Sequence, residues 1–142
     1  MIRRALLAAL LFFGLPRAFR AVVFPSLQRY VLNANAGCDV FVQPSTVNVT
    51  GAPEDAPLWR AIGMLVLDTE EEFLAQRDVA AYRPYFPRSA NNVATGWVPS
   101  SLGNMIRQWH SIEKVWRAMA QYERSHERSQ GHRYARVGFF RL

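Results

Sequence analysis

The hydrophobic residues of this chain gather in four short runs, which are separated by segments of helical periodicity. A short apolar run bounded by glycine, proline or other turn residues is typical of a strand that is buried on both faces, as in a parallel sheet. The runs therefore predict four strands, which cover residues 6–13, 38–44, 61–68 and 133–142.

Two of the segments between these strands place apolar residues three or four positions apart, which predicts helices. One helix is expected over residues 25–33 and stops before Gly37, with its proline in the first turn. The other begins at Thr69, because a threonine followed three residues later by Glu72 forms a capping box. The three carboxylates of residues 70–72 favour the positive end of that helix and are better explained as capping residues than as metal ligands.

A third and much longer helix is expected over residues 101–126, capped by Ser100 or Ser101. The polar segments at 45–57 and 83–100 are expected to be loops. The expected buried stripe of the long helix consists of Leu102, Met105, Ile106, Trp109, Ile112, Trp116 and Met119.

The first apolar run has a second interpretation, as the hydrophobic region of a signal peptide. Arg3 and Arg4 precede the apolar residues 5–15, a run that is too short to span a bilayer, which takes about 20 residues. Pro16 and Arg17 stand where a cleavage site needs small residues. Removal of this run would leave the first helix without its strand, and the strand is therefore favoured.

The alternation of strands and helices predicts the α/β class, with a Rossmann-like, mainly parallel sheet and flanking helices. The length of 142 residues corresponds to one domain, residues 1–142. Leu142 lies in or just after an apolar strand, with neither a covering helix nor a polar tail. We therefore expect the domain to be truncated at its C-terminus.

Composition narrows the chemistry only slightly. A single cysteine, Cys38, excludes an internal disulfide and a thiolate cluster for zinc. The formal net charge is +6, and residues 101–142 carry eight basic against three acidic side chains. Such a basic segment is suited to phosphates, nucleic acid or an anionic glycan, although spaced arginines on a solvated helix face need no ligand.

Several segments, in order, resemble a poorly characterised group of glycosyltransferase-like proteins of algae and other protists. The resemblance covers most of the chain and is weakest over residues 43–60. Relatives tend to carry a histidine with aromatic residues after the second strand, where this chain has Gln43 and Pro44. The segments that carry the resemblance are "LLFFGLPRAF", "SLQRYVL", "CDVFV", "DTEEEF", "SSLGNMIRQWHSIEKVW" and "RYARVGFFRL".

This group is similar to nucleotide-sugar transferases of the GT-A type, in which a Rossmann-like half-domain holds the nucleotide. An Asp-containing motif after a later strand binds Mn²⁺ or Mg²⁺ there, and the metal neutralises charge on the leaving group. The resemblance implies that this chain is the N-terminal, nucleotide-binding part of such a transferase. Its partners would be a nucleotide-sugar donor and a glycan or protein acceptor. Because the acidic motif is missing, the chain alone is expected to be inactive, with no cofactor of its own.

The resemblance also implies where the nucleotide lies. Gly14, Pro16 and Arg17 follow the first strand, where a glycine allows close approach of the backbone and an arginine pairs with phosphate. Asn104 and Gln108, one helical turn apart, are candidates for hydrogen bonds to a base, ribose or sugar.

No catalytic residue or metal ligand is assigned from the sequence. His110 lies beside these two polar residues on the long helix, but neither a carboxylate nor a nucleophile is placed next to it. We therefore expect His110 to be a partly exposed helix residue without a catalytic role.

The sequon Asn48-Val49-Thr50, in a predicted loop, favours the lumen of the secretory pathway, such as the Golgi. Two other functions stay open. The basic last third and "RVGFF" allow a small nucleic-acid-binding domain, although the strand and helix order does not suit one. A signal peptide at residues 5–15 would instead indicate a secreted or membrane-tethered protein without enzymatic activity.

Overall fold

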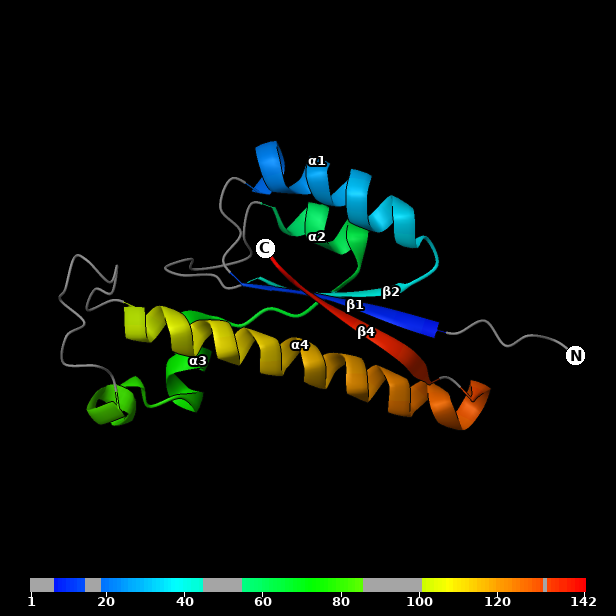
Figure 1. Ribbon diagram of the computed structural model, residues 1–142. Helices are drawn as coiled ribbons and strands as arrows, with labels where there is room; N and C mark the ends of the chain where they lie inside the picture. Colours follow the sequence, from blue (N-terminus) through cyan, green and yellow to red (C-terminus); the bar gives the residue numbers. More distant parts are fainter. Residues whose placement is uncertain (1–6, 15–18, 45–54, 86–100, 132) are drawn as a thin grey trace, which may run out of the picture.

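The computed structural model describes residues 7–14, 19–44, 55–85, 101–131 and 133–142. Its centre is a sheet of four parallel strands in the order β3-β2-β1-β4 (Figure 1). The predicted α/β, Rossmann-like fold is therefore confirmed. The strands are β1 (Leu7–Gly14), β2 (Asp39–Pro44), β3 (Met64–Leu65) and β4 (Tyr134–Arg141).

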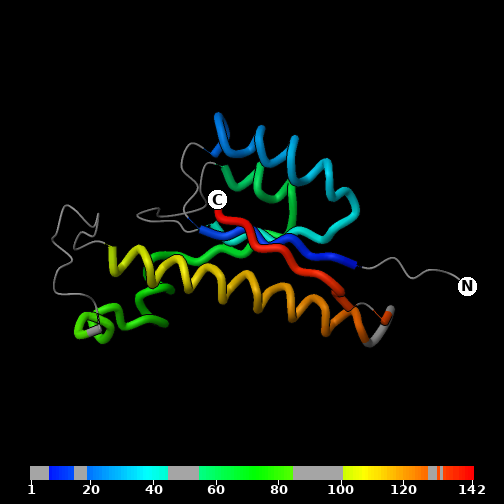
Figure 2. The backbone as a smooth tube through the Cα atoms, in the orientation of Figure 1, coloured from blue at the N-terminus to red at the C-terminus, as the bar shows by residue number. Residues whose placement is uncertain are grey.

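Helices cover both faces of this sheet. The helical segment after β1 and helix α2 lie on one face, whereas α4 runs along the other face with α3 beside it (Figure 1), as the trace in Figure 2 also shows. None of the helices in the described ranges is long and apolar enough to cross a membrane. The helical elements are η1 (Phe19–Val23), α1 (Phe24–Leu27), η2 (Gln28–Leu32), η3 (Asn33–Asn35), α2 (Ala56–Ile62), α3 (Glu70–Gln76), η4 (Val79–Tyr85) and α4 (Ser101–Gln130).

Strand β1 supplies the core on both sides of the sheet. Leu10 and Phe12 pack on the face covered by α1 and α2, whereas Leu11 and Phe13 pack against α4. Successive side chains of a strand point to opposite faces of the sheet. A continuous apolar run is therefore buried only where the strand has a neighbour on each side and helices cover both faces of the sheet. The strand prediction for the first apolar run is confirmed.

The third strand is much shorter than predicted. Residues 56–62 form helix α2, in a region assigned partly to a loop and partly to the strand, and only Met64 and Leu65 pair with β2. The helix buries Trp59 in the core on one face of the sheet, so the apolar residues of this region serve a helix and not a strand. Gly63 then allows the chain to approach β2, since a Cβ at this position would lie 2.4 Å from the Val40 carbonyl oxygen.

The first and last helices also differ from their predictions. The first helical segment begins at Phe19 rather than Pro25, and α4 continues past His126 to Gln130. The buried face of α4 includes Leu102, Ile106, Val115 and Met119 together with the polar His110 and Ser111. Met105, Trp109 and Trp116, placed in the stripe by their hydrophobicity, are exposed. A search for apolar spacing misses a buried face that runs through polar residues.

A polar contact ties β2 and β4, the two strands that flank β1, together at the amino-terminal edge of the sheet. The Tyr134 hydroxyl of β4 donates a hydrogen bond of 2.7 Å to Asp39 Oδ2 of β2, across the start of β1. Burial, the hydrogen bond and the carboxylate charge raise the pKa of Tyr134 far above its ordinary value. This tyrosine therefore stays protonated and holds the edge that lies opposite the candidate site.

Candidate functional site

The order of the strands reverses between β1 and β4. The described helices between β1 and β2 and between β2 and β3 lie on one face, and α4, which precedes β4, lies on the other (Figure 1). In open α/β sheets, ligands bind outside the carboxyl ends of the strands at such a reversal. The end of β1 is therefore the first place to search for a binding site.

Gly14 is the residue at this place. Its φ of 108° lies in the region that favours glycine, and a Cβ added there would meet Arg141 Cγ of β4 at 3.5 Å. The Leu142 amide donates a hydrogen bond of 2.8 Å to the Phe13 carbonyl, which keeps β4 beside β1 up to this point. The structure thus places Gly14 where the sequence predicted it, whereas Pro16 and Arg17 lie outside the described residues.

A polar cavity opens at the same edge of the sheet, on the face covered by α4. Its volume is about 20 Å³, enough for one water molecule or one polar group of a ligand. Gln43 at the end of β2, Asp68 after β3, Thr69 at the start of α3, and His110 and Ser111 of α4 contribute to its lining. Three segments that lie far apart in sequence therefore meet here.

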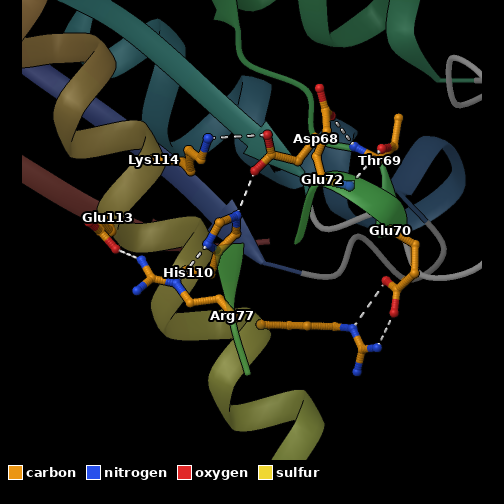
Figure 3. Close-up of polar contacts among 9 residues, drawn as sticks. Asp68, Thr69, Glu70, Glu72, Arg77, His110, Glu113 and Lys114 are labelled. Carbon is orange, nitrogen blue, oxygen red and sulfur yellow. Dashed lines mark hydrogen bonds and ion pairs between the residues drawn. The ribbon is translucent and has the colours of Figure 1, made fainter. Parts of the chain in front are cut away.

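An oriented histidine–carboxylate pair forms one wall of the cavity (Figure 3). His110 Nε2 lies 2.6 Å from Asp68 Oδ2, and Lys114 Nζ lies 3.4 Å from Asp68 Oδ1. On the other side of the ring, Arg77 Nε donates a hydrogen bond of 3.2 Å to His110 Nδ1. Arginine has only donors, so Nδ1 is the acceptor and a neutral ring donates from Nε2 to the carboxylate.

The expectation that His110 is partly exposed and has no carboxylate beside it was wrong, whereas its lack of a catalytic role stays a prediction. Its side chain is buried, it has a carboxylate partner, and its ring packs edge-on against Phe73 at a centroid distance of 5.1 Å. Asp68 comes from the loop after β3, far from His110 in sequence, so no local motif joins them. The available signal was Asp68 itself, an acidic residue at the carboxyl end of an apolar run.

Two further ion pairs hold the region of α3 against α4. Glu70 pairs with the Arg107 guanidinium, which lies over the Phe73 ring at 4.9 Å, and Arg77 pairs with Glu113. The interpretation of residues 70–72 as capping groups is confirmed, because Thr69 and Glu72 form the complete capping box. Glu70 has this second role as the partner of Arg107.

We expect replacement of Thr69 by alanine to lower the free energy of unfolding by about 1 kcal/mol, the usual cost of losing an N-cap side chain. The Thr69 hydroxyl accepts a hydrogen bond of 3.1 Å from the Glu72 amide, and alanine leaves that amide without its cap. Urea denaturation followed by circular dichroism measures the change. The Thr69→Ser variant keeps the hydroxyl and serves as the control; an equal loss in both variants would contradict the capping role.

Gln43 contributes an acceptor without a partner. Its side chain is 2% exposed, and Oε1 has no hydrogen-bond partner in the described part of the structure. A buried acceptor left unsatisfied costs free energy, which a donor such as a hydroxyl, an amide N–H or a water recovers. Gln43 lines the same cavity as His110.

Asn104 and Gln108 are not brought to this cavity. Asn104 is exposed and Gln108 half-buried on α4, and the residues that α4 contributes to the cavity are Arg107, His110 and Ser111. A role of Asn104 and Gln108 in binding stays a prediction from the resemblance.

The carboxylates at the cavity do not fit a divalent metal ion. Asp68 faces His110 and Lys114, and Glu70 is paired with Arg107. Within the described ranges, no three histidine, cysteine, aspartate or glutamate side chains are grouped as metal ligands. The cavity therefore suits a hydrogen-bonding group better than a cation.

Comparisons with known proteins add no family to this geometry. No family model, no curated protein and no solved structure matches the chain.

Proposed function

We propose that this domain is the nucleotide-binding part of a nucleotide-sugar-dependent glycosyltransferase. The observation that carries the proposal is the reversal of strand order beside Gly14, at the carboxyl edge of an all-parallel sheet. The resemblance of the chain to glycosyltransferase-like proteins, whose nucleotide site follows the first strand, supports it. The donor binds at this edge, and the acidic metal-binding motif belongs to the complete transferase.

The residues around Gly14 have the properties that a diphosphate needs. A glycine at the end of β1 lets phosphate oxygens approach the backbone, and the exposed Arg141 beside it offers a guanidinium for a bidentate contact. On the α4 side of the same edge, Gln43 Oε1 accepts a hydrogen bond from a hydroxyl or an amino group. One edge of the sheet thus offers a hydrogen-bond acceptor for the donor substrate and a positive charge for its diphosphate.

Replacement of Gly14 by alanine tests this assignment. We expect the variant to bind UDP-sugars or GDP-sugars at least about tenfold more weakly than the parent chain, a loss of about 1.4 kcal/mol in binding free energy. The added methyl group lies beside Arg141 and blocks the close approach of the diphosphate. Isothermal titration calorimetry against a panel of nucleotide-sugars measures the affinity.

Gly37 offers a matched control. It also has a positive φ, 92°, but it precedes β2 at the opposite edge, and a Cβ there meets nothing within 4 Å. Both alanine variants should therefore lose about 1 kcal/mol of stability from backbone strain. Only Gly14→Ala should lose nucleotide-sugar affinity. Equal affinities of the two variants would contradict the site.

The basic segment allows the proposal to be tested against nucleic-acid binding. A fluorescein-labelled single-stranded RNA, titrated at several salt concentrations, reports on electrostatic binding through the slope of affinity against salt. Salt-dependent RNA binding in a chain that binds no nucleotide-sugar would favour the nucleic-acid module. Nucleotide-sugar binding without RNA binding supports the transferase.

A further inference from the structure

A second and larger hollow lies on the other side of His110. Its volume is about 260 Å³, and it is bounded by the first half of α4 together with Arg77 and η4. His110 lines both this hollow and the polar cavity. The aromatic cleft, as we call it, is lined by Arg77, Tyr82, Met105, Trp109, His110 and Glu113, with Ile106 beneath them.

Large apolar side chains are exposed around the aromatic cleft. Trp109 is 65% exposed, and Tyr82 and Met105 are also open to solvent. Several large apolar side chains exposed around one hollow indicate a binding site, whereas a single exposed apolar side chain is common on protein surfaces. Tryptophan and tyrosine are also the residues that combine a broad apolar face with a polar atom at its edge.

The polar groups of the aromatic cleft balance one another. The guanidinium of Arg77 is paired with the carboxylate of Glu113, and His110 is a neutral ring with Arg77 as its donor. Glu113 is also paired with Arg117 at 2.5 Å, at the outer side of the helix. The cleft therefore offers donors and acceptors of both signs without an excess that would select a strongly charged ligand.

We propose that the aromatic cleft binds a neutral sugar unit of the acceptor glycan. A pyranose ring presents C–H faces, which pack on exposed indole and phenol rings, and hydroxyl edges, which hydrogen-bond to carboxylate and guanidinium groups. The nucleotide is assigned to the edge at Gly14, so the cleft receives the second substrate. This inference rests on the proposed function, to which it adds the class and the place of the acceptor.

The position of His110 links the aromatic cleft to the polar cavity. Its ring separates the two spaces and is held from one side by Asp68 and from the other by Arg77. A sugar in the cleft therefore contacts a histidine whose orientation is fixed by its hydrogen bonds to Asp68 and Arg77.

Trp109 and Trp116 form a matched pair for the test. Both lie on α4, and both are exposed, at 65% and 45%, but Trp116 stacks on Phe139 of β4 and does not line the cleft. Saturation-transfer NMR of the full chain with lactose, cellobiose and mannobiose detects weak binding.

We expect Trp109→Ala to weaken the binding of at least one of these sugars about tenfold, as removal of an aromatic anchor does. Trp116→Ala should leave that binding within about twofold of the parent chain, as expected for a residue outside the site.

A second variant and a second ligand keep the outcomes apart. Trp109→Phe retains an aromatic face and should keep most of the affinity, whereas a loss equal to that of Trp109→Ala overturns the stacking contact. No binding of any of the three sugars, or equal losses at Trp109 and Trp116, overturns the proposal even when nucleotide-sugars still bind. Displacement of the sugar by uridine or guanosine makes the cleft a nucleobase site and also overturns it. Trp109-dependent sugar binding without any nucleotide-sugar binding supports a carbohydrate site but contradicts the transferase.

Discussion

Replacement of Phe12 by alanine is expected to lower the free energy of unfolding by about 4 kcal/mol, within the range for large aromatic side chains removed from a core. Phe12 is fully buried in the central strand and packs with Phe19, Val42 and Trp59. Its ring also stacks on Phe140 of β4 at a centroid distance of 5.1 Å. The substitution removes the contacts of this ring with two neighbouring strands and two helical elements.

Phe139 is the matched control for Phe12. It is the same residue type in the neighbouring strand, but it is 47% exposed. Phe139→Ala should cost less than about 1 kcal/mol, as is usual for surface substitutions. Urea denaturation monitored by far-UV circular dichroism compares the two variants. A small domain has a stability of about 5–15 kcal/mol, so Phe12→Ala removes a large part of it. Equal midpoints for the two variants would contradict the assignment of the core.

Replacement of Asp68 by alanine is expected to cost about 3 kcal/mol, because it leaves the buried His110 ring without its acceptor and the half-buried Lys114 without its carboxylate. His110 Nε2 loses its acceptor at 2.6 Å, and Lys114 loses its carboxylate at 3.4 Å. Asp68→Asn keeps an oxygen that accepts from His110 and removes only the charge, so it should cost about 1 kcal/mol. Denaturant titration of both variants gives the difference.

Asp55 provides the exposed comparison for Asp68. It pairs with Arg20 at 3.1 Å, but the arginine side chain is mostly exposed to solvent. Exposed pairs contribute about 0–1 kcal/mol, so Asp55→Ala should have little effect on stability. A cost for Asp68→Ala no greater than that for Asp55→Ala would show that the His110 network contributes nothing to the fold.

The sheet was predictable because its strands lie in short apolar runs, of which β1 is the most uniform. Residues 7–14 bury side chains on both faces, and this leaves a continuous apolar run in the sequence. The third strand was predicted to be longer than β3 is, because some of the apolar residues before β3 belong to helix α2, which buries Trp59. An apolar run shows that residues are buried but does not distinguish a strand from a helix when both are short.

The candidate site was predictable only in part. The position of Gly14 at the end of β1 was predicted correctly, because the end of the first strand in an α/β fold is a local feature of the sequence, whereas its role in binding stays a prediction. The pair of Asp68 and His110 was missed, because the two residues meet only through the packing of α4 on the sheet. Trp109 was assigned to the core by its hydrophobicity, and only the register of buried residues on α4 shows that it faces outward.

The central place of β1 has a consequence for biosynthesis. Leu7 is registered opposite Tyr134, so one edge of β1 finds its partner only after the chain has been made beyond Tyr134 and has left the ribosome. Until then an apolar strand with unpaired backbone groups is exposed, the kind of edge that pairs with other chains. Contacts between residues so distant in sequence also form slowly. Newly made chains are therefore most vulnerable to aggregation in the interval before β4 docks, and a chaperone that shields β1 would act in that interval.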